Sequence, residues 1–175
     1  MEQGLIHIYC GDGKGKTTCA AGLAVRCAGA GGKVLWVQFL KKDTSGERKS
    51  LEQLENVTLL PGYENIKFTF SMTEKEKNQA SSFYKKQLAE IRQLVKQQFF
   101  DLLIMDEALG AINTGMIAEE EVITFLKEKP QELEVVLTGR DPSSQMVSLA
   151  DYVTNMQKIK HPFDLGISAR KKIEW

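Results

Sequence analysis

The sequence lacks the features that mark membrane-spanning, secreted and nucleic-acid-binding proteins. No apolar run approaches the ~18 residues that a membrane-spanning helix needs, and we expect no signal peptide. The 23 basic and 23 acidic side chains balance, so no overall positive field attracts nucleic acid. Internal repeats and low-complexity tracts are absent as well. We therefore expect a cytoplasmic protein that binds neither a membrane nor a nucleic acid.

Cysteine and histidine are scarce. The three cysteines, Cys10, Cys19 and Cys27, form no C-x-x-C pair and leave an odd thiol, so we expect them to be reduced and buried. The two histidines, His7 and His161, lie far apart in the chain. A zinc site needs a cluster of such side chains. This scarcity argues against a disulfide framework and against a zinc centre.

The composition that remains is that of one globular domain. With 175 residues, 42% hydrophobic and 26% charged, the chain can bury a core of ordinary size. Apolar segments of strand length alternate with longer segments of helical character. Strands joined through helices need crossover connections, which make neighbouring strands parallel. The pattern therefore predicts a single α/β domain over residues 1–175, with a mainly parallel sheet and helices on both faces.

The bounds of the expected elements follow from this pattern. Strands are expected at residues 5–10, 33–40, 101–108, 133–140 and 152–160, with one more short strand within 57–71. Helices are expected at residues 17–30, 73–98, 119–129 and 143–150. Thr73, with Glu76 three residues later, has the sequence of a helix capping box. The polar stretch 41–49 is expected to be a loop.

The clearest functional signal is a glycine-rich stretch between the first strand and the first helix. It consists of Gly11, Asp12, Gly13, Lys14, Gly15, Lys16, Thr17 and Thr18. Glycines let successive backbone N–H groups point at an anion, and the start of a helix adds its positive dipole end. The first glycine of the usual phosphate loop would fall at Cys10, but the strand, loop and helix agree with the motif. We predict an ATP-binding loop with Lys16 on the outer phosphates and Thr17 on Mg²⁺; the alternative is a flexible surface loop.

An apolar strand ends in two carboxylates, Asp106 and Glu107. At the carboxyl edge of a parallel sheet, at least one of them would lie near the glycine loop and hold Mg²⁺, directly or through water. Two acids are also common where a strand passes into a helix cap, so the metal role depends on the loop.

Four further side chains stand out, two arginines with two interpretations each and two phenylalanines. Arg26, on the first helix, either faces a ligand or is solvated. Arg140 follows an apolar strand, and it either acts at the binding edge or forms an ion pair. Phe68 and Phe70 fall on the same side of an extended segment, where core packing is the simple explanation.

Taken together, these segments resemble one known family. The ATP:corrinoid adenosyltransferases of the P-loop type contain, in the same order, segments similar to GDGKGKTTCAAGLAVRCAGAG, VQFLKK, GER, FTF, LLIMDE, VVLTGRDP, LADYVTNM and KHPFDLGISARKKIE. The matches run from Gly4 to Trp175. The resemblance implies a RecA-like P-loop NTPase-type domain. It also implies transfer of the 5′-deoxyadenosyl group of ATP to the cobalt(I) of a reduced corrinoid, cobalamin or cobyrinic acid a,c-diamide, with release of triphosphate.

The resemblance implies roles for individual residues. Residues 11–18 match the ATP loop, and Thr17 and Glu107 match the Mg²⁺ site. Four residues match catalytic positions of the family: Lys16, Arg26, Glu107 and Arg140. Phe68 and Phe70 match an aromatic pair that displaces the lower axial base of cobalamin and so eases the reduction of cobalt(II). The family further implies a homodimer, and a flavoprotein is a candidate reductant.

The chain departs from the family pattern in several places, and two other protein classes remain as alternatives. Tyrosines that follow the two acids in many members are absent from DEALGAINTG. Enteric members have tryptophan where this chain has Phe70, and the near-terminal glycine of the family is Lys172 here. A small RecA-like or partitioning-type ATPase would also place acids after a strand, but the chain shows no second arginine-finger segment and no basic DNA face. A nucleoside kinase is disfavoured because zinc-binding cysteines and a cluster of lid arginines are missing.

Overall fold

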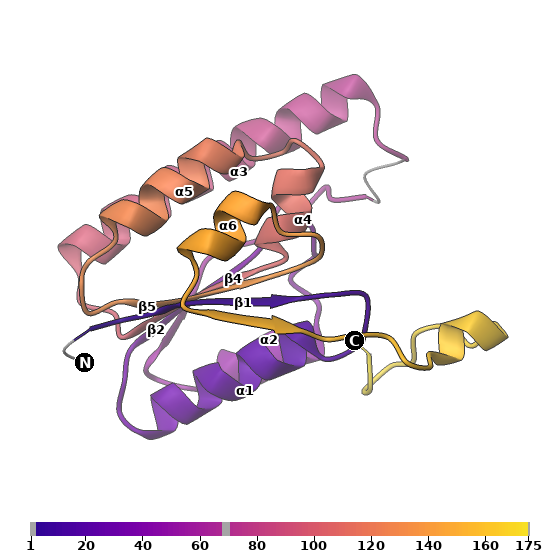
Figure 1. Ribbon diagram of the computed structural model, residues 1–175, viewed down its shortest axis with the longest axis horizontal. Coiled ribbons are helices and arrows are strands. Elements are labelled where there is room, and N and C mark those ends of the chain that lie inside the picture. Colours follow the sequence, from indigo (N-terminus) through magenta and orange to yellow (C-terminus); the bar gives the residue numbers. More distant parts are fainter. Residues whose placement is uncertain (1–2, 68–70, 175) are drawn as a thin grey trace.

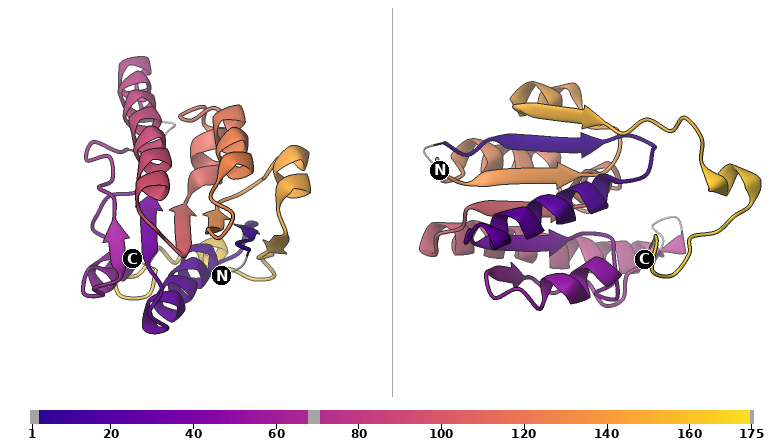
Figure 2. Two further views of the ribbon diagram at one scale, coloured as in Figure 1. Left: turned by 90° about the vertical axis from the view of Figure 1, so that its left-hand side faces the viewer. Right: turned by 90° about the horizontal axis from the view of Figure 1, so that it is seen from below.

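The computed structural model describes residues 3–67 and 71–174 of the chain. A six-stranded sheet, parallel in every strand pair, forms the middle layer of the molecule. Helices cover both faces of the sheet, and the residues after the last strand form an arm that projects beyond its carboxyl edge (Figure 1, Figure 2). The predicted α/β architecture is confirmed.

The strands and helices have the following bounds. The strands are β1 (Ile6–Cys10), β2 (Val34–Gln38), β3 (Val57–Leu59), β4 (Leu102–Asp106), β5 (Glu134–Thr138) and β6 (Tyr152–Asn155). The α-helices are α1 (Lys16–Gly29), α2 (Gly46–Leu51), α3 (Glu74–Gln97), α4 (Ala108–Asn113), α5 (Glu119–Glu128) and α6 (Ser144–Leu149). A short 3-10 helix, η2 (Pro162–Leu165), lies in the projecting arm. Within the two described ranges, no helix is both long enough and apolar enough to cross a bilayer.

The strand order brings the ends of distant chain segments together. The order is β3-β2-β4-β5-β1-β6, so β5 separates β1 from β4. Gln38 at the end of β2 lies opposite Asp106 at the end of β4, and Tyr9 in β1 lies opposite Thr138 at the end of β5. Because all strands run in one direction, the residues that follow β1, β2, β4 and β5 meet at one edge.

Alternating side chains of the strands supply a core on each face of the sheet. On one face, α1 and α2 pack over a cluster that includes Trp36 and Ile104. On the other face, α3 to α6 pack over a larger cluster that includes Leu35 and Leu103. Successive strand residues point to opposite faces, and β2 and β4 are buried at every position. This double burial explains why the central strands are apolar almost throughout.

Local sequence signals predicted most helices, but one polar stretch misled. Thr73 accepts the N–H of Glu76, and the Glu76 carboxylate accepts the N–H of Thr73, so the predicted capping box of α3 is confirmed. The loop predicted for residues 41–49 is wrong in part, because α2 begins within it. Arg48 and Leu51 of α2 are buried, and this tertiary packing outweighs the polar composition. The short helix α4, directly after β4, has no counterpart in the sequence prediction.

β6 is shorter than predicted. It ends at Asn155 rather than at residue 160. The next residue, Met156, bonds the loop after β1: its N–H donates to Cys10 O at 2.8 Å, and its carbonyl oxygen accepts the N–H of Gly13 at 2.6 Å. These bonds attach the start of the arm to the end of β1 and to the glycine loop.

Candidate functional site

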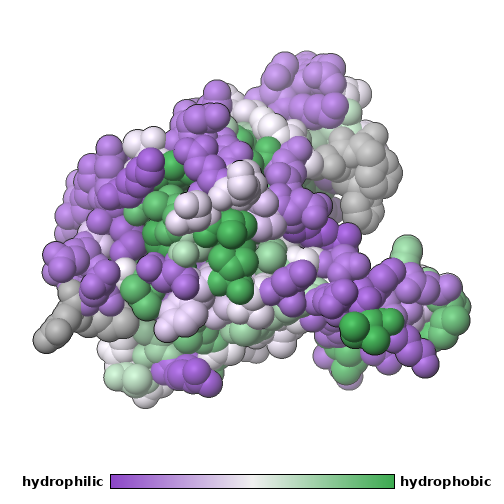
Figure 3. Space-filling view, in the orientation of Figure 1, coloured by the Kyte–Doolittle hydropathy of each residue, from purple (hydrophilic) through white to green (hydrophobic). Residues whose placement is uncertain are grey.

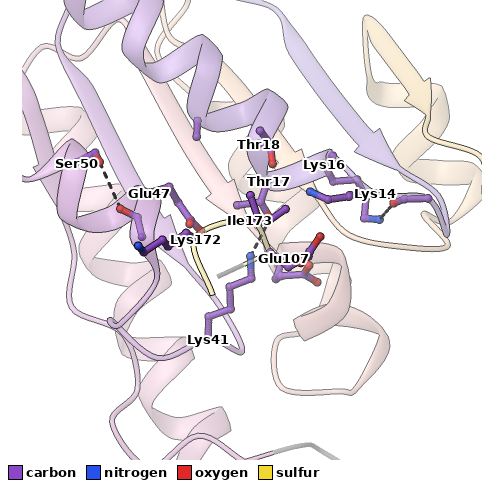
Figure 4. A pocket seen from close by; sticks show the side chains of 15 residues that line it. Lys14, Lys16, Thr17, Thr18, Lys41, Glu47, Ser50, Glu107, Lys172 and Ile173 are labelled. Carbon is purple, nitrogen blue, oxygen red and sulfur yellow. Dashed lines mark hydrogen bonds between the residues drawn. The ribbon is translucent and has the colours of Figure 1, made fainter. Parts of the chain in front are cut away.

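A pocket of about 530 Å³ opens at the carboxyl edge of the sheet. Its walls come from the loop after β1, the turn after β2, the start of α2, the residue after β4, and the segment 172–174 (Figure 4). Residues 13–18 of the predicted phosphate loop all line it. Its charged lining consists of Lys14, Lys16, Lys41, Lys172, Glu47, Glu107 and Glu174. The fold therefore gathers the predicted phosphate loop and one predicted metal ligand around one cavity.

The loop after β1 needs its glycines for conformation and for close approach. Gly11 and Gly15 have φ values of 107° and 115°, in the region that favours glycine. A Cβ atom on Gly11 would collide with Asn155, and one on Gly13 would collide with the carbonyl oxygen of Met156. The segment that follows β6 thus presses on the loop and fixes its path along the pocket.

The start of α1 faces the pocket and is open to an anion. Among the described residues, no side chain caps this helix at Gly15, and its first turn contains no acid. The first backbone N–H groups of a helix lack partners within the helix and carry its positive dipole end. Thr17 and Thr18, in the first turn, line the pocket. This helix terminus therefore fits a phosphate group.

The ammonium of Lys16 is held inside the loop. It donates to Gly11 O and to Gly13 O, both at 2.7 Å. Burial lowers the pKa of Lys16, Arg140 lowers it further, and the carboxylate of Glu107 opposes both effects. Arg140 is exposed and does not line the pocket. Its neighbour Gly139 donates its N–H to Tyr9 O at 3.2 Å, which brings the start of this turn beside the end of β1. A phosphate oxygen would compensate the partly buried charge of Lys16 better than two carbonyl oxygens do.

The structure does not bring Asp12 and Arg26 into the pocket. Asp12 Oδ1 accepts the N–H of Lys158 at 2.9 Å, which ties the loop to the arm. This hydrogen bond is the main reason that the pKa of Asp12 is lowered. Arg26 lies exposed on α1, nine residues after Thr17 and hence about 14 Å further along the helix axis. Their predicted roles stay predictions without geometric support in this chain.

Asp106, at the end of β4, is fully buried and accepts four hydrogen bonds. Its Oδ1 atom accepts from the hydroxyl groups of Thr17 at 2.9 Å and Thr138 at 2.7 Å. Its Oδ2 atom accepts from the ammonium of Lys41 at 2.8 Å and the amide of Gln38 at 3.3 Å. Asp106 is therefore the carboxylate that contacts the loop threonine directly.

Glu107, the next residue, lines the pocket in a left-handed conformation with φ 58°. Its N–H donates to Thr138 Oγ1 at 2.9 Å. Backbone strain of this kind costs about 1–3 kcal/mol and is concentrated at functional sites. Burial raises the pKa of Glu107, and the neighbouring charge of Asp106 raises it further. Three cations lower this pKa, and Lys41 has the largest effect among them. A partly buried acid with a raised pKa that faces a pocket is typical of a functional site.

The oxygen atoms of Thr17, Asp106 and Glu107 fit a magnesium ion. Mg²⁺ usually takes one or two carboxylates together with substrate phosphates and water. Lys41 Nζ already lies 2.8 Å from Thr17 Oγ1 and 2.8 Å from Asp106 Oδ2, so this place accommodates a cation. Beside it, the buried Gln38 Oε1 has no partner among the described residues, and a metal-bound water could donate to it. Among the described residues, no group of three or more His, Cys, Asp or Glu side chains could hold a metal ion. Substrate phosphates would therefore have to complete the ligand shell.

The two aromatic residues predicted to contact the corrinoid, Phe68 and Phe70, lie outside the described residues. On either side of them, Ile66 and Met72 are buried in the larger core. The corrinoid role of the two phenylalanines stays a prediction.

Sequence reasoning missed the contribution of the C-terminal segment to the pocket. Lys172 lines the pocket with φ 73°, a conformation that favours glycine. The departure from the family glycine at this position was the available signal. Glu174 also lines the pocket, and its ion pair with Arg170 lowers the pKa of Glu174 to about 2, with a smaller contribution from Lys14. The tail therefore covers the phosphate loop with charges of both signs.

Comparison with known proteins agrees with this geometry. Residues 2–175 match the sequence profile of a family described as ATP:corrinoid adenosyltransferase BtuR/CobO/CobP. The chain is 33% identical to the corrinoid adenosyltransferase of Escherichia coli K12 over 177 residues, which cover 99% of this chain and 87% of that protein. It is 32% identical to the corrinoid adenosyltransferase CobA of Salmonella typhimurium LT2, with the same coverage. It is 34% identical to a corrinoid adenosyltransferase of a Sinorhizobium species over 181 residues, or 99% of this chain and 81% of that protein.

Proposed function

The chain belongs to the ATP:corrinoid adenosyltransferase family, and from this premise we propose that its pocket holds the triphosphate of ATP while a reduced corrinoid takes the adenosyl group. The protein is accordingly an enzyme, a transferase. One observation carries the proposed site: the N-terminus of α1, the ammonium of Lys16 and the acids after β4 converge on a single cavity. Such a set of groups suits a polyphosphate with its metal ion.

In the proposed reaction, cobalt(I) of the corrinoid donates an electron pair to C5′ of ATP. The C5′–O bond breaks, its electron pair leaves with triphosphate, and the cobalt is formally oxidised to cobalt(III). Cobalt(I) is itself a strong nucleophile, so no side chain has to act as nucleophile or general base. The protein supplies position and charge instead. Lys14, Lys16 and the first amides of α1 would stabilise the departing triphosphate.

We assign Mg²⁺ to the wall of the pocket formed by Thr17 and Glu107, with Asp106 as a further candidate ligand. When bound, the ion would neutralise charge on the polyphosphate and so make it a better leaving group. Thr138 helps to position both acids, because its hydroxyl group contacts both the Asp106 carboxylate and the Glu107 backbone.

Two arginines and two aromatic residues complete the proposed set, on different grounds. Arg140 follows Gly139, whose N–H donates to Tyr9 O at 3.2 Å beside the start of the glycine loop, and this position supports a contact with the polyphosphate. Arg26 is proposed from the family resemblance alone. For the corrinoid we propose Phe68 and Phe70, whose apolar rings would fill the lower face of cobalt without ligating it.

We further propose a cytoplasmic homodimer, with a flavoprotein as candidate reductant. The arm after β6 supports the dimer, because it exposes large apolar side chains on a projection from the body (Figure 3). These are Ile159, Phe163, Leu165 and Ile167, with exposed fractions from 49% to 87%. The three cysteines are free, which supports a reducing compartment. The expectation that all three are buried is wrong, because Cys19 is exposed on α1 and Cys27 is half-buried. Sedimentation velocity should give twice the 19.6 kDa mass of one chain, and a monomer at micromolar concentration would contradict the dimer.

The products of ATP test the proposed function. The protein is incubated with ATP, Mg²⁺ and chemically reduced corrinoid, and the products are separated by anion-exchange chromatography. We expect triphosphate and adenosylated corrinoid in equal amounts, and neither product when corrinoid is omitted. A small RecA-like or partitioning-type ATPase would instead release ADP and phosphate without corrinoid, and that result would overturn the proposal.

A further inference from the structure

The side chain of Lys41 ends between two oxygen atoms that are suited to hold a metal ion. Its ammonium donates to Thr17 Oγ1 and to Asp106 Oδ2, both at 2.8 Å; Figure 4 shows it reaching Thr17 across the pocket. The Asp106 side chain is 0% exposed, whereas that of Lys41 is 29% exposed. The ammonium therefore neutralises a buried carboxylate from the pocket side, where a ligand can reach it.

The hydroxyl group of Thr17 uses its proton and one of its two lone pairs in this arrangement. A hydroxyl group has one proton to donate and two lone pairs. The proton of Thr17 goes to Asp106 Oδ1 at 2.9 Å, and a lone pair accepts the ammonium of Lys41. A metal ion on Thr17 would need that same oxygen, and a metal ion on Asp106 Oδ2 would meet the same ammonium.

The backbone that carries Lys41 is held by hydrogen bonds, whereas its side chain is attached through rotatable bonds. The preceding Leu40 has φ 54°, and its N–H donates to the hydroxyl group of Tyr84 at 3.0 Å. The N–H of Phe39 donates to Asp106 O at 2.9 Å. The four-carbon stem of a lysine has several freely rotating bonds, and Lys41 lines the same pocket as Lys14 and Lys16. Rotation of the stem alone can therefore move the ammonium from the carboxylate into the cavity.

We propose that Lys41 is the resident counter-ion of the metal site. Its ammonium occupies the cation position while nucleotide is absent, and a divalent cation displaces it when metal and nucleotide enter together. This inference rests on the proposed metal role of the Thr17 wall. The displaced ammonium stays in the pocket, where the polyphosphate becomes its new partner. A metal ion that binds without nucleotide must displace the ammonium of Lys41 and leaves it without an anionic partner. Because ATP supplies that partner, metal and ATP should bind cooperatively.

The test uses Mn²⁺ as the probe, with free Mn²⁺ measured by electron paramagnetic resonance on the full-length protein. Lys41→Met removes the charge and keeps most of the stem. Without nucleotide, we expect Lys41→Met to bind Mn²⁺ at least about fivefold more tightly than wild type, because a like charge has been removed from contact distance. Lys42→Met is the matched control: it removes the neighbouring charge and should change the affinity less than twofold. Among the described side chains, those that bond Thr17 and Asp106 do not include Lys42. Adding Asp106→Asn to Lys41→Met should abolish the gained binding.

A second variant covers the case in which Lys41→Met fails to fold. Lys41→Gln removes the charge but keeps a donor for Asp106, and it should show the same gain in Mn²⁺ affinity with a smaller loss in melting temperature. Equal Mn²⁺ affinity in wild type, Lys41→Met and Lys41→Gln would overturn the inference about Lys41. The proposed metal site would still stand in that case, provided that wild type binds Mn²⁺ in the presence of ATP. If neither wild type nor any variant binds Mn²⁺ with ATP, the proposed metal site fails, and the inference fails with it.

Discussion

Replacing Thr138 with valine should show whether one buried hydroxyl group positions both acids of the pocket. Thr138 is 0% exposed, donates to Asp106 Oδ1 at 2.7 Å and accepts the N–H of Glu107 at 2.9 Å. Valine has nearly the same shape but no hydroxyl group, so it removes these two bonds without opening a large cavity. The substitution therefore tests polar contacts rather than packing.

The expected magnitude follows from which groups lose their partners. In Thr138→Val, the buried N–H of Glu107 loses its acceptor, which costs about 1–3 kcal/mol. Asp106 loses one of its four donors and keeps those of Thr17, Lys41 and Gln38. We therefore expect the free energy of unfolding to fall by about 1–3 kcal/mol. For a chain of this size, the melting temperature should fall by roughly 2–4 °C for each kcal/mol.

The catalytic effect should exceed what lost stability explains. Without its bond to Thr138, the strained backbone of Glu107 loses a constraint, and supporting residues of a metal site typically contribute about 10–100-fold to metal affinity or activity. Urea denaturation gives the stability, and triphosphate release at increasing Mg²⁺ concentration gives the metal dependence. Thr138→Ser is the control, since it keeps the hydroxyl group and should keep the wild-type Mg²⁺ dependence. If valine and serine variants require the same Mg²⁺ concentration, the hydroxyl group does not position the acids.

Three further predictions concern the loop lysine, the second acid and the aromatic pair. Lys16→Ala should lower adenosyl transfer at least about 100-fold, because the ammonium that stabilises the negative charge of the departing triphosphate is lost. The melting temperature should change little, and near-normal turnover would contradict the loop assignment. Burial, and then the charge of Asp106, raise the pKa of Glu107, so its ionised form costs folding free energy once the pH exceeds the ordinary pKa of a glutamate. Glu107→Gln should therefore raise the melting temperature at neutral pH while weakening Mg²⁺-dependent transfer, and a gain that persists below that ordinary pKa would refute this explanation. Phe68→Ala and Phe70→Ala should lose transfer mainly from cobalt(II) corrinoid with a lower base and far less from pre-reduced cobalt(I); equal losses, with about 3–5 kcal/mol of lost stability, would indicate core packing instead.

Signals that act over a few residues were sufficient for much of the fold and for the conformation of the glycine loop. The capping box of α3 needs only Thr73 and Glu76, three residues apart. The loop after β1 needs glycine at Gly11 and Gly15 because the backbone itself turns there with positive φ. Alternation of apolar strands and helices predicted the parallel sheet, because a crossover connection leaves few other arrangements. The stretch that became α2 was misjudged, since burial of its side chains depends on distant packing.

The sequence by itself determined the position of the glycine loop before α1 and which edge of the sheet carries acids. Local backbone chemistry decides both, because a glycine loop before a helix and a strand ending in carboxylates work through adjacent residues. Tertiary structure alone decided that Asp106 contacts Thr17, and that Thr138 and Lys41 hold it from either side. These side chains come from four segments that are remote in the chain, and strand order and register bring them within hydrogen-bond distance. The same holds for the tail: Lys172 and its neighbours reach the pocket because the arm returns to the glycine loop, and no spacing in the sequence encodes that return.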